Sequence, residues 1–350
     1  MPKAGRLLVL AVLAACKIPD VSFMGLPRDT GVPGDAQIDV AVQPVLRSCI
    51  GLPPTCGPSR NGSCCESLLV PGGTFYRSYD KAGDGDSGDM NARATVSEFR
   101  LDKYEVTVGR FRAFVEAGMG TQEHPPASNS GAHPNRLNSG WDATWNTQLE
   151  TTTPELRQQL HDRSPDGTMW TLAPDTNENR AINVVSWYEA MAFCIWDGGY
   201  LPTEAEWNYA AAGGDDQRAY PWSRSSSPGD KTITTDLASY NGGTDCMSVV
   251  QLPTASSCTI TPVGIRPSGD GRWGHSDLAG NVDEWVLDWY AAPYASPCMD
   301  CVNLTAPPPP LYRVTRGGSL TSPARDLRTG LRGQSGMPNY ILGIRCARRP

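Results

Sequence analysis

Asn183-Val184-Val185-Ser186-Trp187-Tyr188-Glu189-Ala190, followed by Leu201-Pro202-Thr203-Glu204-Ala205-Glu206-Trp207, is the stretch that contributes most to predicting the fold. Ser186 and Glu189 have the spacing of a capping box, in which the two residues satisfy each other's backbone N–H groups. Thr203 and Glu206 repeat this spacing. Apolar residues follow each box with helical periodicity, and a glycine closes each segment. The stretch therefore predicts two short, capped helices.

Short strands and long loops are predicted around these two helices. A third helix is expected after Thr107, which has the chemistry of an N-cap, and Gly118 ends it. Residues 119–180 are polar and irregular, and with 36 Gly and 30 Pro much of the backbone is expected in turns and loops. Strands are predicted at residues 69–75, 99–104, 313–319 and 342–347.

The N-terminal segment has the features of an export signal. Residues 1–16 combine two basic residues with a short apolar run, and Leu13-Ala14-Ala15-Cys16 matches a bacterial lipobox. We therefore expect residues 1–16 to be a lipoprotein signal peptide and Cys16 to carry the lipid. Residues 17–47 are expected to be a tether between the membrane and the folded domain. The alternative is a secretory signal in which Cys16 is incidental. Lys17 rather than Asp after Cys16 favours the outer membrane.

Charge and cysteine content narrow the classes of partner and site. The net charge is −7 with no basic stripe, so nucleic acid is not expected as a partner. Ten of the eleven cysteines remain after Cys16, which in an exported chain favours disulfides. Residues 48–67 hold Cys49, Cys56, Cys64 and Cys65 and are expected to form a small cross-linked knot. A zinc site is the alternative, but the paired spacing typical of zinc ligands is missing.

Several short segments, in their order along the chain, resemble the formylglycine-generating enzyme (sulfatase-modifying) family. The resemblance covers residues 68–350 and implies an α+β, C-type-lectin-like fold with little regular secondary structure. Besides the two helical segments above, the matching segments are Val70-Pro71-Gly72-Gly73-Thr74-Phe75, Asp102-Lys103-Tyr104-Glu105-Val106-Thr107, Asp277-Leu278-Ala279-Gly280-Asn281-Val282-Asp283-Glu284-Trp285, Arg316-Gly317-Gly318-Ser319 and Gly343-Ile344-Arg345-Cys346-Ala347.

The resemblance also implies a reaction that this sequence does not support. The family oxidises a cysteine in a C-x-P-x-R segment of a sulfatase to formylglycine, and two enzyme cysteines bind Cu(I) for this purpose. The matching positions here are Ser322 and Leu327. Soft thiolates select Cu(I), whereas a hydroxyl is a hard ligand and an isobutyl group has no donor atom. Copper is therefore not expected as a cofactor.

The resemblance implies one long-range disulfide, between Cys194 and Cys346. Two buried free thiols are the alternative. A second family disulfide would use the positions of Ala211 and Arg332, where both cysteines are absent. Local bridges Cys246–Cys258 and Cys298–Cys301 are also predicted, although connectivity cannot be deduced from sequence.

The segment that ends at Trp285 resembles the family's calcium loop. By that resemblance Asp277 and Glu284 would supply side-chain oxygens, and Gly280 and Val282 backbone carbonyls. An all-oxygen set suits Ca²⁺, here as a structural ion. The alternative is a turn whose acids only form hydrogen bonds. A second family calcium site, near Ser239, lacks its acidic residue and is not predicted.

The late arginines have two interpretations from sequence. They either line a peptide-binding cleft or pair with surface acids. The residues concerned are Arg316, Arg325, Arg328, Arg332 and Arg345.

Three functions remain open at this point. The first is a non-catalytic binding or scaffolding lipoprotein that holds a peptide, glycan or protein ligand in the family cleft. The second is an active enzyme of the family, suggested by the retained Arg316–Ser319 segment and the calcium loop. The third is an architectural envelope protein in which the tether and the cysteine knot matter most.

Overall fold

A computed structural model describes residues 45–83, 88–163, 167–241 and 259–350. The predicted signal peptide, Cys16, nearly all of the tether and the Cys246–Cys258 bridge lie outside these ranges. Within them no helix has the length and apolarity needed to cross a membrane.

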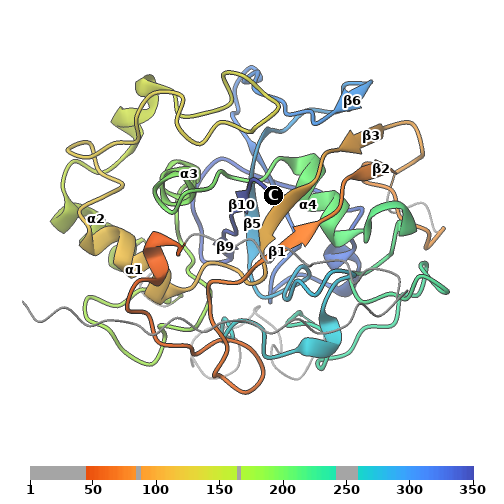
Figure 1. Ribbon diagram of the computed structural model, residues 1–350, viewed down its shortest axis with the longest axis horizontal. Helices are drawn as coiled ribbons and strands as arrows, with labels where there is room; N and C mark the ends of the chain where they lie inside the picture. The colour runs from red at the N-terminus through yellow and green to blue at the C-terminus, as the bar shows by residue number, and fades with distance from the viewer. Residues whose placement is uncertain (1–44, 84–87, 164–166, 242–258) are drawn as a thin grey trace, which may run out of the picture. The chain divides into compact units, whose positions relative to one another are not determined.

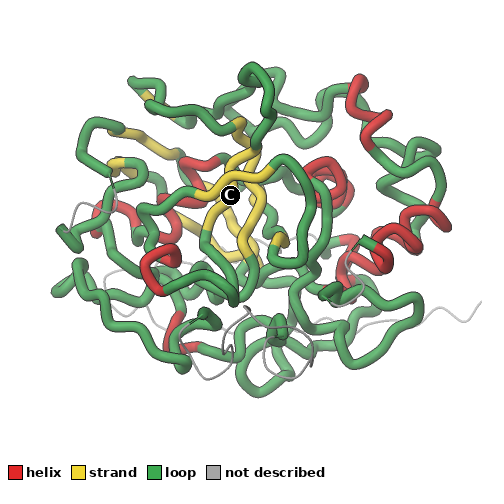
Figure 2. The backbone as a smooth tube through the Cα atoms, turned by 180° about the vertical axis from the view of Figure 1, so that it is seen from behind, coloured by secondary structure: helices red, strands yellow, loops and turns green. Residues whose placement is uncertain are grey.

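The strands form three small sheets rather than one large one. Their orders are β1-β4-β10, β2-β3-β6 and β8-β7-β5-β9. Short helices accompany these sheets, and loops make up most of the backbone (Figure 2). This is the irregular α+β architecture that was predicted. The strands are β1 Ser67–Val70, β2 Gly73–Tyr76, β3 Arg93–Val96, β4 Phe99–Asp102, β5 Asp283–Trp289, β6 Cys298–Met299, β7 Arg313–Arg316, β8 Gly333–Ser335, β9 Leu342–Gly343 and β10 Ala347–Arg348.

Two of the predicted strands are each divided in the structure. The stretch 69–75 is split into β1 and β2 at Pro71 and Gly72. Proline has no N–H for a ladder, and a Cβ on Gly72 would lie 2.7 Å from the carbonyl oxygen of Val96, so the chain turns closely against its neighbour here. The stretch 342–347 similarly gives β9 and β10, which belong to different sheets.

The predicted helices form with their predicted caps. Thr107 accepts a hydrogen bond from the N–H of Arg110, and the capping boxes of Ser186 with Glu189 and Thr203 with Glu206 are complete. A fourth α-helix, α2, was not predicted. The helices are α1 Val108–Glu116, α2 Thr153–Asp162, α3 Trp187–Trp196 and α4 Glu204–Ala211, and the 3₁₀ segments are η1 Arg47–Cys49, η2 Ala143–Gln148, η3 Gly214–Asp216, η4 Pro267–Gly269 and η5 Ala324–Leu327.

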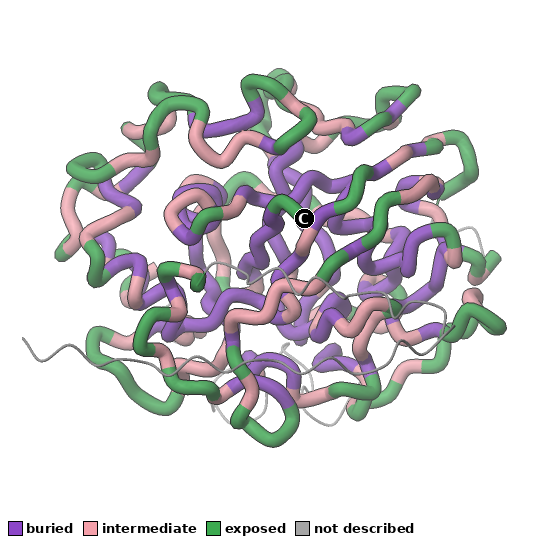
Figure 3. The backbone as a smooth tube through the Cα atoms, in the orientation of Figure 1, coloured by how far each residue is buried: buried purple, intermediate pink, exposed green. Residues whose placement is uncertain are grey.

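The core lies between the helices and the central strands. In Figure 1 α4 lies beside β5, and it packs against both β5 and β7, while α3 packs against β5. Figure 3 shows buried backbone concentrated around these elements and exposed backbone in the outer loops. Trp187, Trp207 and Trp285 are buried and form part of this core.

The cysteine-rich segment is fixed to this core. Disulfides join Cys49 to Cys65 and Cys56 to Cys64, so these sulfurs are not zinc ligands. The N–H of Ser48 donates to Asp197 over 2.8 Å, and its hydroxyl accepts from Arg110 over 3.0 Å. Through Ser48 the segment therefore packs onto α1 and the end of α3.

Candidate functional site

Two of the segments that carry the family resemblance meet beside the four-stranded sheet. Residues 277–282 lead into β5, and residues 317–320 follow β7. The N–H of Gly280 donates to the carbonyl of Gly317 over 3.1 Å, and the N–H of Leu320 donates to the carbonyl of Asn281 over 3.0 Å. Both glycines have positive φ, +85° and +101°, a backbone region that glycine reaches without strain. The two loops are therefore held together by their backbones.

Ser322 and Leu327 meet at Gly318, within the second of these loops. A Cβ placed on Gly318 would lie 3.3 Å from the Cβ of Ser322 and 3.1 Å from the Cδ1 of Leu327. The Ser322 hydroxyl accepts a hydrogen bond from the N–H of Ser319 over 3.0 Å. The fold therefore brings the two family positions together, although neither side chain is a thiol.

Leu327 is packed into an apolar cluster. It is 1% exposed, and the cluster includes Tyr220, Tyr240 and Ala279. A Cβ on Gly280 would lie 3.2 Å from the Cδ2 of Leu327, so the side chain also contacts the first loop. This position is thus part of the core and is not a ligand facing an open polar cleft.

Every cysteine in the described ranges takes part in a disulfide. The predicted Cys194–Cys346 bridge joins α3 to the residue preceding β10, and the local Cys298–Cys301 bridge also forms. Among the described residues no thiol is therefore available as a soft ligand.

The predicted calcium loop contains a buried ion pair. Glu284 accepts from Arg345 over 2.7 and 2.9 Å through one oxygen, and from Arg345 and Trp207 Nε1, each over 2.7 Å, through the other. Asp277 is half-buried, has φ of +56°, and accepts from the N–H of Gly264 over 2.6 Å. Of the two predicted carboxylates, Glu284 thus accepts four hydrogen bonds, whereas among the described residues Asp277 accepts one, from Gly264.

A third carboxylate, that of Glu105, lies near Asp277 and Glu284, and the three are called the carboxyl cluster below. It is fully buried and accepts from the side-chain amide of Asn281 over 2.6 Å and from the N–H of Val282 over 3.1 Å. Burial raises its pKa well above the usual range, and the negative charges of Asp277 and Glu284 raise it further. Burial also raises the pKa of Asp277 and that of Glu284.

Three carboxyls, Glu105, Asp277 and Glu284, are thus faced by two cations, Arg345 and Arg266. Arg345 lowers the pKa of all three carboxyls, and Arg266 adds to this at Asp277, yet each pKa stays above its usual value. Across the described ranges no three His, Cys, Asp or Glu side chains are grouped to hold a metal ion. A Ca²⁺ ion here would thus depend on the carbonyls of Gly280 and Val282 as well as on Asp277.

The late arginines pair with acids, and most do so inside the protein. Arg316 and Arg332 both bind Glu204, over 2.7 and 2.6 Å, and Arg328 binds Asp80. Only the pair of Arg325 with Asp326 is largely exposed among these. The ion-pair interpretation is therefore correct, but the partners are mostly buried rather than at the surface.

Sequence reasoning assigned no role to Glu105. It lies within the quoted segment 102–107, but its partner Asn281 is 176 residues away, so no local spacing reveals the contact. An acid between the apolar Tyr104 and Val106, at the entrance to a capped helix, is the one sequence feature that could have indicated it.

Comparison with known proteins places the chain in a family. The family described as "Sulfatase-modifying factor enzyme 1-like domain" matches residues 54–350. The formylglycine-generating enzyme of Streptomyces coelicolor is 31% identical over 311 residues, covering 83% of this chain and 92% of that protein. That of Thermomonospora curvata is 28% identical over 273 residues, covering 72% and 82%.

Two further proteins extend the comparison. The Bos taurus protein named inactive C-alpha-formylglycine-generating enzyme 2 is 27% identical over 252 residues, covering 66% of this chain and 73% of that protein. The structure of PvdO from Pseudomonas aeruginosa has a TM-score of 0.54 at 18% identity, covering 82% of this chain and 95% of that one, and so shares the fold. The chain belongs to the sulfatase-modifying factor enzyme 1-like family.

Proposed function

We propose that this chain is a non-catalytic member of its family that binds or scaffolds a partner at the cell envelope. The observation that carries the proposal is the replacement of the family's copper-binding cysteines by Ser322 and Leu327. The cysteines that the described ranges do contain are all in disulfides, so none of them can take the place of the missing copper-binding pair.

The surroundings of Leu327 support this reading. Cu(I) in a protein is held by soft sulfur ligands, and a buried leucine side chain contributes only packing. A thiolate at this position would lose the apolar contacts that Leu327 makes, so the local core is adapted to the hydrocarbon. One family member of similar sequence is itself named inactive.

The alternative is an active enzyme, favoured by the retained Arg316–Ser319 segment. Each retained feature also has a structural explanation, however. Arg316 forms a buried ion pair with Glu204, and Gly317 accepts a hydrogen bond from Gly280. Both residues therefore have contacts that support the fold, whether or not the protein is catalytic.

The decisive experiment is to incubate the purified protein with Cu(I) and a C-x-P-x-R peptide, and to capture any aldehyde with an aminooxy probe. We expect no aldehyde above the no-protein control, whereas the Streptomyces coelicolor enzyme serves as the positive control. Aldehyde formation by the wild-type chain would overturn the proposal.

A matched variant makes the negative result interpretable. Because Ser322 and Leu327 both lie close to Gly318, the double variant Ser322→Cys/Leu327→Cys places two thiols near the same backbone position. We expect it to bind Cu(I), measured by competition with a Cu(I) chelator, while the wild-type chain does not. Equal Cu(I) affinity of both proteins would contradict the coordination argument.

We also propose export and attachment to the envelope, in a bacterium the outer membrane, through lipid on Cys16. The four disulfides of the described ranges support an oxidising compartment. The test is detergent phase partitioning of the full chain expressed in a bacterial host. Wild type should enter the detergent phase and Cys16→Ala the aqueous phase; identical partitioning would remove this part of the proposal.

We further propose a structural Ca²⁺ ion, held by Asp277 and the carbonyls of Gly280 and Val282, with Glu284 sharing its carboxylate between the ion and Arg345. The excess of carboxyls (Glu105, Asp277 and Glu284) over the cations that face them (Arg345 and Arg266) supports it. When bound, the ion would supply positive charge and no catalytic chemistry. It would connect the loop residues Asp277, Gly280 and Val282 to Glu284 of β5.

A further inference from the structure

Strand β2 lies at the edge of its sheet and pairs with β3 on one side only (Figure 1). In an antiparallel pair, residues that exchange hydrogen bonds with the neighbouring strand alternate with residues that do not. The N–H of Arg77 donates to the carbonyl of Ala92, so Arg77 is in a bonded pair. By alternation Phe75 is also bonded to β3, whereas the N–H and C=O groups of Thr74 and Tyr76 point away from β3.

At Tyr76 this outward side is covered by a side-chain amide. Gln217 accepts from the N–H of Tyr76 over 2.5 Å and donates to its carbonyl over 3.1 Å. A side-chain amide has the donor and the acceptor of a peptide group, so the edge already binds one peptide-like group here. The N–H and C=O of Thr74, in contrast, form no hydrogen bond with the described residues. The edge of β2 is thus closed at Tyr76 and open at Thr74.

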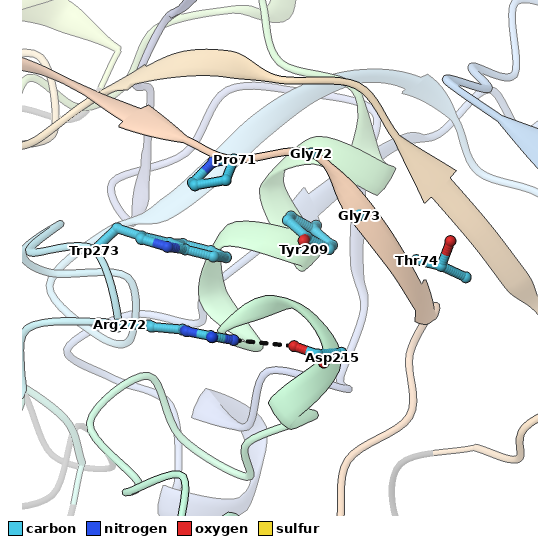
Figure 4. Close-up of a pocket in the computed structure, with 8 residues that line it drawn as sticks. All are labelled: Pro71, Gly72, Gly73, Thr74, Tyr209, Asp215, Arg272 and Trp273. Carbon is cyan, nitrogen blue, oxygen red and sulfur yellow. Dashed lines mark hydrogen bonds and ion pairs between the residues drawn. The ribbon is translucent and has the colours of Figure 1, made fainter. Parts of the chain in front are cut away.

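A cavity of about 420 Å³ lies beside this open position. Residues 71–74 form one side of it. Successive residues of a strand face opposite sides of the sheet, so a cavity that both Gly73 and Thr74 line lies at the edge of β2 rather than over one face. Its volume is within the range of about 300–1,000 Å³ found for ligand sites. The remaining lining residues are Tyr209 of α4, Asp215 of η3, Arg272 and Trp273 (Figure 4).

The far wall of the cavity is packed against itself and offers polar groups rather than a free aromatic face. The Trp273 ring is stacked with Tyr209, and the Arg272 guanidinium lies over the same ring, each at 5.5 Å from its centroid. Arg272 Nη1 donates to the Oδ1 atom of Asp215 over 3.0 Å. Within the part of the chain that the structure describes, the Oδ2 atom of Asp215 and the Tyr209 hydroxyl form no hydrogen bond. Asp215 is 79% exposed, so its second oxygen is available to a ligand.

These features fit an extended peptide. A donor and an acceptor on one residue of an edge strand are matched by the carbonyl and the N–H of another extended backbone, which then adds to the sheet as a further strand. Because η3 and residues 272–273 border the opposite side of the cavity, the space admits one extended segment rather than the edge of a folded domain. The free Oδ2 atom of Asp215 and the net charge of −7 favour a basic side chain on that segment.

We infer that the open edge of β2 binds a basic peptide in extended conformation, as an added strand. The carbonyl and N–H of one peptide residue bond to the N–H and C=O of Thr74, and a lysine or arginine side chain reaches Asp215. The inference gives a partner class to the proposed binding role and rests on it to that extent. The cavity lining does not include Ser322 or Leu327, and the peptide needs no cysteine. Peptide binding and oxidase activity are therefore measured separately, and either can fail alone.

The first test varies the peptide. The probe is fluorescein-labelled K-T-V-T-V-K amide, whose central residues favour extended structure, and fluorescence polarisation with the full chain measures its Kd. Methylation of one alternate set of peptide N–H groups should raise the Kd about tenfold, and methylation of the other set should change it little, because only one set faces the neighbouring strand. E-T-V-T-V-E amide should bind several-fold more weakly than the lysine peptide.

The second test varies the edge. Thr74→Pro removes the outward N–H at a place where proline is tolerated, because this N–H takes no part in the sheet. Thr74→Val is the matched control: both variants lose the hydroxyl that lies 3.0 Å from that of Thr95, but valine keeps the N–H. We expect Thr74→Pro to raise the Kd about tenfold and Thr74→Val to leave it unchanged. Asp215→Asn should remove the preference for the lysine peptide over the glutamate peptide.

Melting temperatures show whether the variants are folded, and if Thr74→Pro is not, the methylated peptides on the wild-type chain test the inference alone. Absence of peptide binding would overturn it, as would equal losses for both methylated sets or equal Kd values for folded Thr74→Pro and Thr74→Val. A wild-type dimer in analytical ultracentrifugation that Thr74→Pro converts to a monomer would also overturn it, because the occupant of the edge would then be a second copy of the chain.

Discussion

Arg345 and Glu284 form an ion pair with no exposed surface, in which Nη2 and Nε of the arginine each approach a carboxylate oxygen to 2.7 Å. Arg345 also donates to the carbonyls of Asp102 and Ser276, over 3.2 and 3.0 Å. One guanidinium thus connects the end of β4, the loop before residue 277 and strand β5.

Arg345→Met should therefore be strongly destabilising. It leaves Glu284 buried without its counter-charge and removes a hydrogen-bond donor from three carbonyls, those of Asp102, Lys103 and Ser276, a loss expected to cost about 3–5 kcal/mol. Urea unfolding followed by tryptophan fluorescence measures the change in the free energy of unfolding. The double variant Arg345→Met/Glu284→Gln should recover part of the loss, because no uncompensated charge remains.

Arg325→Ala provides the comparison for this prediction. Its pair with Asp326 is exposed, and such pairs contribute about 0–1 kcal/mol. Equal losses for Arg325→Ala and Arg345→Met would show that burial does not set the value of the Arg345 pair.

Calcium should stabilise the protein if the loop binds it. The melting temperature should rise when CaCl₂ replaces EDTA, with about 2.7 kcal/mol gained when free Ca²⁺ is one hundred times Kd. Asp277→Asn should reduce this gain, since it removes a charged ligand, while Mg²⁺ should give a smaller one because it demands a tighter octahedron. Identical melting in EDTA and CaCl₂ would exclude the ion.

The helices were predictable because their signals are local. Each capping box lies within four residues, so Ser186 with Glu189 could be recognised directly. The missed helix α2 carries the same signal, Thr152 with Glu155 and a proline in its first turn, but it lies inside a long polar stretch with only Leu156 and Leu160 buried. The helix was missed because its apolar face is too small to give a clear helical period, although its N-terminal cap is complete.

The candidate site was predictable only in part, because its contacts are non-local. The motif positions placed Ser322 and Leu327, and the structure adds that Leu327 packs with Tyr220 and Tyr240, far away in the sequence. The buried partners of Glu105 and Arg316 likewise depend on tertiary packing. Burial and pairing of charges cannot be deduced from a linear pattern without the fold.

The two confirmed disulfides should differ in their contribution to stability. Reduction of the Cys194–Cys346 bridge opens a separation of 152 residues, which corresponds to about 5 kcal/mol in the chain-entropy treatment. The Cys298–Cys301 bridge spans 3 residues and corresponds to about 1.6 kcal/mol. Double alanine variants compared by urea unfolding test this ordering, and a larger loss for the short bridge would contradict it.

His133 should make stability depend on pH. Burial lowers its pKa, but the hydrogen bond and charge of Glu206, with Nε2 3.1 Å from Oε1, outweigh burial and raise the pKa overall. A raised pKa means that the folded state binds the ring proton more tightly than the unfolded state does, at the cost of the hydrogen bond that Nδ1 accepts from the N–H of Asn135 over 3.1 Å. The stabilisation is fully present below the unfolded value of about 6.5 and is lost as pH rises through the folded pKa.

The variant His133→Gln isolates this contribution because glutamine does not titrate. The difference in the free energy of unfolding between wild type and His133→Gln should be constant below about pH 6 and should shrink steadily as pH rises above about 6.5. His161→Gln is the matched control, since its pair with Asp162 is exposed. A difference for His133→Gln that stays constant up to pH 9 would mean that the ring is neutral in the folded protein and binds Glu206 only as a neutral donor.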